Sequence, residues 1–312
     1  MTEAGKEAAP ESLRAAEDMT LVTRFAPSPT GPLHLGHAFS AWMAHDLARS
    51  AGGHFLLRIE DIDRTRSRES WERAIYEDLA WLGIRWDAPP MRQSDRLGVY
   101  DDALRWLWAE GLIYACSCSR RDIVAAASAP QEGAEPQRGP DGIVYPGTCR
   151  AFARTPASPM PQHTALRLDM RAALERIGAD TISFDEIGRG QPQRRRRPAK
   201  DMLEQVGDVV LSRRDFPGSY HLSVVLDDGA QGITHIVRGE DLGEATWIHR
   251  VLQDLFSLPR PVYHHHRLIR DPEGRRLAKR DDARAISAYR NDGLSPDDLR
   301  KLVGLGGSPA VP

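Results

Sequence analysis

Apolar residues in the first third of the chain alternate between short continuous runs and longer stretches with helical spacing. Residues 21–26 (LVTRFA) and 54–61 (HFLLRIED) predict two short strands, and the apolar run in the second indicates burial on both faces. Residues 35–47 carry apolar side chains at helical spacing, and two later stretches of this kind end at Gly83 and Gly111. Strands that alternate with helices predict an α/β fold with a parallel sheet.

The α/β pattern lapses between residue 116 and about residue 190, and it is restored further along the chain. There the strand-like segments YHLSVVLDD and ITHIVRGED precede the helical stretch ATWIHRVLQDLF. Residues 125–142 are rich in Ala, Pro, Gly and Gln, which is typical of a mobile loop. We therefore predict a disordered N-terminal extension (1–20), a split α/β domain (21–115 and 207–258), an inserted subdomain (116–206) and a C-terminal segment (259–312).

Composition and charge narrow the functional classes. The hydrophobic fraction of 41% and the charged fraction of 28% are those of an ordinary soluble globular protein. The chain has no apolar run of about 18 residues and no signal-peptide core, so we expect a cytoplasmic protein. A formal net charge of -2 gives no general attraction to nucleic acid. Arg194 to Arg197, flanked by Arg189 and Lys200, could form a local RNA-binding patch, or simply a solvated loop.

The three cysteines are clustered along the sequence. Cys116 and Cys118 form a C-x-C pair, and Cys149 lies four positions after Tyr145. Disulfides are disfavoured in the cytosol, whereas three thiolates and a fourth ligand suit a structural zinc ion. We predict a zinc site at Cys116, Cys118, Tyr145 and Cys149, with three free thiols as the alternative and with water or His as alternatives to the phenol. His264 to His266 lack such partners, so we expect a strand-to-loop segment there.

The segment RFAPSPTGPLHLGHAF (24–39) joins the first predicted strand to the first helix. Its three prolines reduce the entropic cost of holding the turn. His34 and His37 are three residues apart at the helix start, so their rings share a face near free backbone N–H groups. Imidazole donors there could stabilise phosphate charge, and Gly36 could let a base approach the backbone. Taken alone, the two histidines could equally be ordinary polar residues at a helix start.

The string HLGH (34–37) resembles the HIGH signature of class I aminoacyl-tRNA synthetases, and the longer RFAPSPTGPLHLGH resembles the glutamyl subgroup. The resemblance continues through LLRIEDIDRTR, YHLSVVLDDGAQGITHIVRGEDL and GRRLAKRDDA. It implies a Rossmann-like catalytic domain with a zinc-bearing insertion, which forms glutamyl-adenylate from glutamate and Mg-ATP and transfers glutamate to RNA. It also implies an ATP site formed by His34, Gly36, His37 and Lys279, with His34, His37 and Lys279 as catalytic residues.

The segment RRLAKRDDA lies where class I enzymes carry the mobile KMSKS loop. Lys279 matches the second lysine of that motif, a partner for phosphate charge in the transition state. Arg276 replaces the first lysine and Ala278 replaces the usual serine. The cation is retained and a hydroxyl is lost, so we expect slow activation or a different hold on ATP. Read without the resemblance, this segment is a basic run of the kind that usually forms a solvated face.

Charged residues close to the predicted strand ends suit an amino acid with two carboxylates. Arg24 could hold a carboxylate bidentately and Glu60 could accept from an ammonium group, although either alone could be a surface ion pair. Val224 lies where discriminating glutamyl enzymes usually carry Asn, a departure shared with a paralogous group. The resemblance implies a glutamate pocket lined by Arg24, Phe25, Ala26, Pro27, Ser28, Glu60, Tyr220 and Arg238.

The sequence ends about thirty residues after Lys279, so we expect no anticodon-binding domain. In this respect it resembles the shorter paralogues that esterify glutamate on to queuosine in the anticodon loop of tRNA(Asp). The resemblance thus implies that the partners are L-glutamate, ATP and queuosine-bearing tRNA(Asp), and we expect a monomer. The alternatives are a minimal glutamyl-tRNA synthetase that charges a tRNA 3′ end and a catalytically silent, zinc-containing RNA-binding paralogue.

Overall fold

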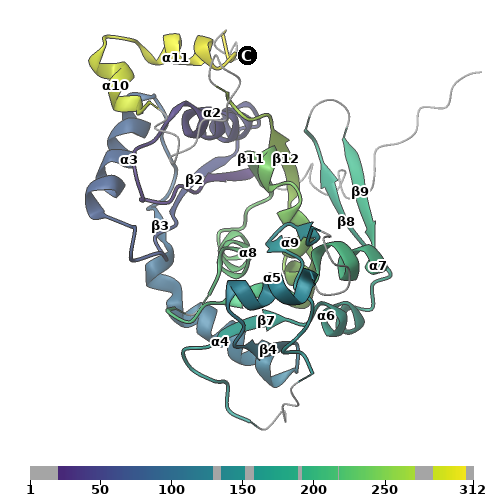
Figure 1. The fold of residues 1–312 in the computed structure, drawn as a ribbon. Coiled ribbons are helices and arrows are strands. Elements are labelled where there is room, and N and C mark those ends of the chain that lie inside the picture. The colour runs from purple at the N-terminus through teal and green to yellow at the C-terminus, as the bar shows by residue number, and fades with distance from the viewer. Residues whose placement is uncertain are drawn as a thin grey trace, which may run out of the picture.

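A mostly parallel β-sheet forms the core of the protein (Figure 1). The computed structural model describes residues 20–128, 135–151, 158–188, 192–216, 218–270 and 284–306. The Thr234 backbone N–H donates to the Val22 carbonyl at 3.0 Å, so two groups of strands lie edge to edge. The first group is β3 (Met91–Arg92), β2 (His54–Ile59) and β1 (Val22–Phe25); the second is β11 (His235–Gly239), β12 (Val262–His266), β8 (Thr181–Glu186) and the antiparallel edge strand β9 (Gln193–Pro198).

Helices cover both faces of this sheet, which confirms the predicted α/β class. In β2, Phe55 and Leu57 pack into one apolar cluster, whereas Leu56 between them packs against the other. The first cluster lies under α2 (Leu35–Ser50), α3 (Glu69–Trp81), α10 (Ile286–Asn291) and α11 (Pro296–Leu302). The second includes α4 (Leu97–Ala109), α6 (Met170–Ile177), α8 (Tyr220–Ala230) and α9 (Ala245–Leu255).

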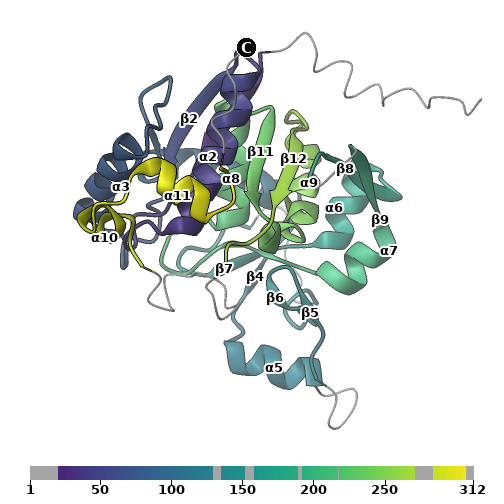
Figure 2. The ribbon, with the colours of Figure 1, turned by 90° about the horizontal axis from the view of Figure 1, so that it is seen from above.

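A smaller antiparallel sheet lies beside the core sheet. Its order is β10 (Val210–Ser212), β7 (Ala165–Leu168) and β4 (Ile113–Cys116). Figure 2 shows α5 (Arg120–Ser128) and the hairpin of β5 (Arg138–Gly139) and β6 (Gly142–Ile143) projecting from the main body. The remaining elements are the short helix α7 (Ala199–Asp201), a π-helical turn (Met202–Val206) and two 3₁₀ turns (Gln93–Arg96 and Glu240–Leu242).

The segment YHLSVVLDD forms helix α8 and not the predicted strand. A short apolar run fits a buried helix as well as a buried strand, so its length and composition could not decide between them. Two features of the structure favour the helix. The Ser219 hydroxyl accepts from the Leu222 backbone N–H as an N-cap, and Leu222, Val224 and Val225 are all buried.

Two other segments contain more regular structure than their composition predicts. The predicted loop 125–142 includes the end of α5 and the β5–β6 hairpin, whose Gly142 adopts φ +101° at the turn; residues 129–134 lie outside the described part. Arg194 to Arg197 belong to β9 and not to a loop. Arg194 there pairs with Asp185 across the strands at 2.8 Å.

The predicted insertion 116–206 contributes β8 and β9 to the core sheet, so the two are structurally continuous. The predicted N-terminal extension lies outside the described residues, apart from Thr20. Among the helices that the structure describes, none combines the length and apolar character needed to cross a bilayer.

A buried carboxylate joins helix α8 to the first two strands. Arg24 Nε and Nη2 donate to the two oxygens of Asp228 at 2.9 and 3.2 Å, and Arg58 Nη1 donates at 2.6 Å. Arg58 is 0% exposed and Asp228 is 4% exposed. Burial disfavours the charged carboxylate, but Arg24 and Arg58 outweigh it and lower the pKa of Asp228. The three groups therefore form one compact charged unit within the core.

We expect Asp228→Ala to lower the free energy of unfolding by about 3–5 kcal/mol, because it removes the carboxylate that pairs with the buried Arg24 and the nearest of the carboxylates around the buried Arg58. Asp101→Ala is the matched control: this carboxylate pairs with Arg105 on the exposed side of α4, and its loss should cost less than about 1 kcal/mol. Urea unfolding followed by circular dichroism measures both. Similar costs for the two variants would contradict the importance of the buried unit.

A second stability prediction concerns Asp78 on α3, which is 3% exposed. Burial raises the pKa of Asp78 from 3.8 to about 6, and Arg290 only partly offsets this effect. Between these pH values the folded chain binds a proton that the unfolded chain does not, so this group's contribution to stability falls as pH rises through 6. Asp78→Asn should therefore raise the melting temperature at about pH 7.5, with a gain that shrinks on acidification. A gain that stays constant with pH would contradict this assignment.

Candidate active site

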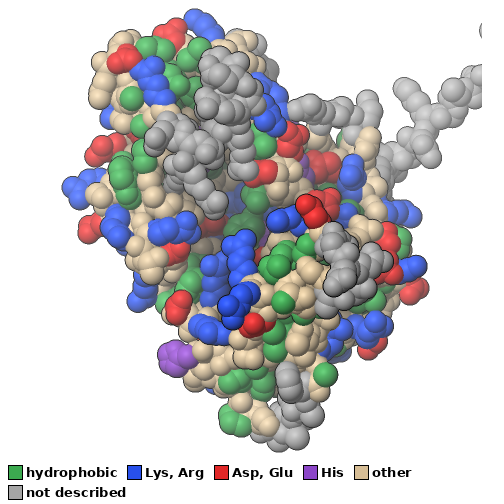
Figure 3. All heavy atoms as spheres, viewed as in Figure 1, with side chains coloured by type: hydrophobic (Ala, Val, Ile, Leu, Met, Phe, Trp, Pro, Cys, Tyr) green, Lys and Arg blue, Asp and Glu red, His purple; other side chains and the backbone are tan. Residues whose placement is uncertain are grey.

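A cavity of about 430 Å³ opens where the carboxyl ends of β1, β2 and β11 meet the start of α8. This is the edge at which open parallel sheets bind their ligands. On the face shown in Figure 3, Lys and Arg side chains gather beside a central hollow. The cavity brings together all eight residues predicted for the glutamate pocket, together with His37; its lining is Arg24, Phe25, Ala26, Pro27, Ser28, Thr30, His37, Ser40, Glu60, Asp63, Arg66, Tyr220, Val224, Val237, Arg238, Gly239 and Leu242.

The proline-rich turn after β1 is bonded to the chain that follows β2. The Pro27 carbonyl accepts from the Glu60 backbone N–H at 3.0 Å, and the Pro29 carbonyl accepts from the Arg68 N–H at 3.0 Å. Prolines restrict the unfolded chain and so lower the entropic cost of this geometry. One wall of the cavity is therefore held in place by backbone hydrogen bonds as well as by proline rings.

His34 and His37 cap the N-terminus of α2 reciprocally. His34 Nδ1 accepts from the Gly36 N–H at 3.1 Å, and His37 Nδ1 accepts from the His34 N–H at 3.2 Å. Because Nδ1 is the acceptor in both, each neutral ring carries its proton on Nε2 and presents a donor there. The ring centroids are 3.8 Å apart, so both donors lie at one helix N-terminus, a favourable place for an anion.

Gly36 is needed for this double cap. A Cβ atom built at Gly36 would lie 3.0 Å from Cε1 and 3.1 Å from Nδ1 of the His34 ring. A side chain at this position would therefore push His34 away from the Gly36 N–H. This role adds to the predicted one, in which the bare backbone admits a base.

Arg24 binds a carboxylate bidentately, but that carboxylate belongs to Asp228 of the same chain. Its guanidinium also lines the cavity, so it supplies positive charge to the floor while it is held by α8. Glu60 Oε1 accepts from Arg58 Nη2 at 3.3 Å. Burial raises the pKa of Glu60, although Arg58 and Arg24 oppose the change. Sequence analysis did not identify Asp228 and Arg58 as parts of the site. The feature that could have pointed to Asp228 is the pair of acidic residues Asp227 and Asp228 in the otherwise apolar α8.

Arg238 and Tyr220 meet on the opposite wall. Arg238 Nη1 donates to the Tyr220 hydroxyl at 3.3 Å, and its Nη2 donates to Thr246 Oγ1 at 2.6 Å. Burial raises the pKa of Tyr220 despite the nearby arginine, so the phenol keeps its proton. His249 and His265 also contact Arg238, at 3.1 and 3.2 Å. Sequence analysis missed Thr246 and both of these histidines as partners of Arg238, because nothing in the local sequence indicates that β12 and α9 surround this arginine.

The three cysteines also meet in space. Within the part of the chain that the structure describes, their Sγ atoms all lie within 4.8 Å of one another. The Tyr145 hydroxyl lies 3.5 Å from Cys116 Sγ and 3.3 Å from Cys118 Sγ, and it accepts from the Cys149 N–H at 2.9 Å. The four predicted ligands thus surround one point at the junction of β4 with the projecting hairpin. This donor set fits a thiophilic ion such as zinc.

The thiols of this cluster differ in acidity: burial raises the pKa of Cys118, whereas the pKa of Cys149 is lowered. Burial opposes ionisation, but hydrogen bonds from Tyr145, Ser117 and Cys118 lower the pKa of Cys149 to about 6. Arg167 stacks over the Tyr145 ring at 4.0 Å and donates to Cys116 Sγ at 3.3 Å, so it adds positive charge beside the sulfurs. Burial and the three thiols raise the pKa of Tyr145, so the phenol is the weakest of the four predicted ligands.

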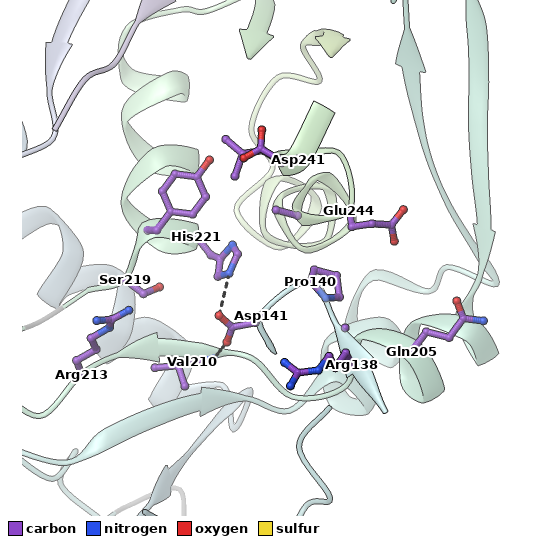
Figure 4. Close-up of a pocket in the computed structure, with 14 residues that line it drawn as sticks. Arg138, Pro140, Asp141, Gln205, Val210, Arg213, Ser219, His221, Asp241 and Glu244 are labelled. Carbon is purple, nitrogen blue, oxygen red and sulfur yellow. Dashed lines mark hydrogen bonds and ion pairs between the residues drawn. The ribbon is translucent and has the colours of Figure 1, made fainter. Parts of the chain in front are cut away.

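A second cavity of about 500 Å³ adjoins the first and shares Tyr220 and Leu242 with it. Figure 4 shows its lining, in which Asp141 from the β5–β6 hairpin reaches His221 of α8. Arg138 and Arg213 also line it, as do the carboxylates of Asp241 and Glu244. This cavity lies between the projecting hairpin and the core.

The remaining predicted features are the KMSKS-like segment and the three consecutive histidines. Lys279, with Arg276 and Ala278, lies outside the described residues. His264 to His266 end β12, as expected for a strand-to-loop segment, and they take no part in the thiol cluster.

Comparisons with known proteins agree with the resemblance that the sequence motifs indicate. The model of the family "tRNA synthetases class I (E and Q), catalytic domain" matches residues 20–151 and 192–311. A glutamyl-Q tRNA(Asp) synthetase from Rhodobacter capsulatus is 61% identical over 286 residues, which cover 91% of this chain and 100% of the relative. The protein of the same name from Symbiobacterium thermophilum is 40% identical over 89% of this chain and 84% of the relative.

The fold also resembles a solved structure of glutamate tRNA ligase from Elizabethkingia meningosepticum in complex with its amino acid. The TM-score is 0.71 at 26% sequence identity, over 94% of this chain and 62% of the ligase. This chain therefore spans about three fifths of the length of that enzyme. The sheet, the HLGH turn and the whole-length likeness to curated relatives agree: the chain belongs to the class I aminoacyl-tRNA synthetases, in the family that the glutamyl-Q tRNA(Asp) synthetases form.

Proposed function

We propose that this protein activates L-glutamate with Mg-ATP and transfers the glutamyl group to queuosine in the anticodon loop of tRNA(Asp). The observation that carries the proposal is a cavity in which cationic and acidic side chains adjoin the doubly capped HLGH turn. The choice of queuosine rests on the names of the relatives that match over their whole or nearly whole length. ATP and tRNA are cytoplasmic substrates, so we propose that compartment for the reaction.

In the first step a glutamate carboxylate oxygen bonds to the α-phosphorus of ATP, and the bond to pyrophosphate breaks. Negative charge develops on the phosphate oxygens, where the Nε2–H donors of His34 and His37 and the ammonium of Lys279 stabilise it. In the second step a queuosine hydroxyl oxygen attacks the activated carbonyl carbon. An ester forms, AMP leaves with the bonding electron pair, and the hydroxyl proton is released to the leaving phosphate or to solvent.

Recognition of the amino acid follows from charge. We assign Arg238 and Tyr220 together to a substrate carboxylate, with the second Nη2–H of Arg238 and the O–H of Tyr220 as the donors to it. Glu60 faces the same cavity and is assigned to the α-ammonium group. Arg24 adds long-range attraction from the floor, although Asp228 holds its guanidinium. The backbone and side chains of Phe25 to Ser28 close the pocket.

The transfer is tested with radiolabelled glutamate, ATP and two preparations of tRNA(Asp), one containing queuosine and one lacking it. We expect label only on the queuosine-containing RNA, in the anticodon loop. Equal labelling of both at the 3′ end would instead establish a minimal glutamyl-tRNA synthetase, the activity that the likeness to the solved ligase favours.

Glutamate-dependent exchange between ATP and pyrophosphate completes this test, since it separates an enzyme from a silent RNA-binding paralogue. The wild type should catalyse exchange without RNA, and Lys279→Ala should reduce the rate at least about a hundredfold through lost transition-state stabilisation. Absence of exchange in the wild type would contradict the proposed function.

We further propose that Cys116, Cys118 and Cys149 hold a structural zinc ion, with Tyr145 at the fourth position. The convergence of three sulfurs and a phenol supports this proposal. The cluster joins the end of β4 to the chain after β6, and its buried part is small, so a metal would fasten a region with little apolar core. The ion would supply no chemistry to the transfer.

Protein purified without chelator should contain about one zinc per chain, and Cys149→Ser should abolish binding. Tyr145→Phe should retain zinc but lose it faster to a chelator, because the phenol is the weakest predicted donor. Plasma emission spectrometry gives the stoichiometry, and a colorimetric chelator gives the rate. Wild-type protein that stays free of zinc after refolding with the metal would contradict the site.

A further inference from the structure

Two histidines hold Arg238 through ring nitrogens that must lack a proton. Arg238 Nη1 faces His249 Nδ1 at 3.1 Å, and Arg238 Nε faces His265 Nε2 at 3.2 Å. A guanidinium group only donates hydrogen bonds, so both of these ring nitrogens accept. The neutral tautomers follow: His249 carries its proton on Nε2, and His265 carries its proton on Nδ1.

The N–H group of each ring donates away from Arg238, and each route ends at a carboxylate. His249 Nε2–H donates to His221 Nδ1 at 3.2 Å, which leaves His221 Nε2–H to donate to Asp141 Oδ1 at 3.4 Å. His265 Nδ1–H donates directly to Glu186 Oε2. All the bonds therefore point away from Arg238, in two chains that end at Asp141 and Glu186.

The chains are buried at the arginine, and only the one that ends at Asp141 reaches an exposed carboxylate, since the Glu186 side chain is 16% exposed. Arg238 is 5% exposed, His249 2% and His221 6%. Burial and the adjacent Arg238 lower the pKa of His249 well below its usual value, so this ring stays neutral, as its tautomer requires. The Asp141 side chain is 36% exposed, in the turn of the β5–β6 hairpin. Glu186 is fixed further because its Oε1 accepts from the His265 and Gly188 backbone N–H groups.

Both carboxylates belong to the segment 116–206, and neither lines the cavity assigned to glutamate. Figure 4 shows Asp141 reaching from the hairpin across to His221 on α8. Glu186 reaches His265 from the end of β8. The orientation of Arg238 thus depends on two points of a segment that does not touch the amino acid.

We propose that Asp141 and Glu186 are positioning residues for glutamate: through His221, His249 and His265 they hold the Arg238 guanidinium in the plane that pairs with the substrate carboxylate. This inference rests on the proposed function, in which Arg238 binds that carboxylate. His265, His249, Tyr220 and Thr246 take four of the five Arg238 N–H groups, so the contact with the substrate carboxylate depends on the aim of the second Nη2–H. A released guanidinium would lose that aim and should bind glutamate less well. The ATP site, at the HLGH turn, should be unaffected.

Asp141 provides the cleanest test, because its side chain is exposed and its variants should fold. The melting temperature of each variant checks that it does. In ATP–pyrophosphate exchange, Asp141→Ala should raise the KM for glutamate about fivefold, the worth of one hydrogen bond, with the KM for ATP unchanged. Asp141→Asn should restore most of the affinity, because the amide oxygen can still accept from His221. Glu204→Ala, an exposed carboxylate of the same segment, is the control and should change neither constant.

A double-mutant cycle tests whether Asp141 acts on Arg238 through His249. His249→Leu removes the acceptor facing Arg238, whereas His249→Asn can place an amide oxygen near the position of Nδ1 and should partly rescue the KM for glutamate. Asp141→Ala should add little to His249→Leu, because the two lie in one chain. Fully additive effects, or equal rises in both KM values, would overturn the positioning role.

Different experimental results would contradict the inference and the proposed function. If Arg238→Lys leaves the KM for glutamate unchanged, the assignment of Arg238 to the substrate is wrong and the proposed function loses its recognition element. If Arg238→Lys raises that KM while Asp141→Ala and Asp141→Asn match the wild type, only the positioning role is overturned.

Discussion

The buried carboxylate of Asp228 is the interaction on which both the fold and the site depend. It pairs with Arg24 of β1 and, together with Glu60, with Arg58 of β2, so that both buried cations have a counter-charge. The same contacts fix α8 over the carboxyl ends of both strands, where the cavity opens. Charge compensation in the core and the positive floor of the cavity are thus one arrangement, and Arg24 takes part in both.

Hydrogen bonds similarly orient the other side chains that we assign to the substrates. His34 and His37 each accept through Nδ1 in the cap of α2, so each neutral ring carries its proton on Nε2 at the helix N-terminus. Arg238 is held by the acceptors of Thr246, His249 and His265. In each case a group that we assign to substrate is oriented by a second group that the substrate does not touch, which is the preorganisation that catalysis requires.

Sequence analysis predicted what depends on local pattern and what a resemblance transfers. The parallel strands, the helix that begins after His34, the grouping of the cysteines with Tyr145 and the shared cavity of Arg24, Glu60, Tyr220 and Arg238 all agree with the structure. The segment YHLSVVLDD was wrong as a strand, because a short apolar run has no decisive period. Asp228, His249 and His265 were missed because their partners lie at least ten positions away in the sequence and meet them only in the folded chain.

A crystal structure with a non-hydrolysable analogue of glutamyl-adenylate tests the site most directly, because it locates both halves of the ligand at once. The glutamyl group should lie between Glu60 and Arg238, with the phosphate against the Nε2 atoms of His34 and His37. An analogue bound elsewhere, or bound with its phosphate remote from that helix N-terminus, would contradict the central assignment.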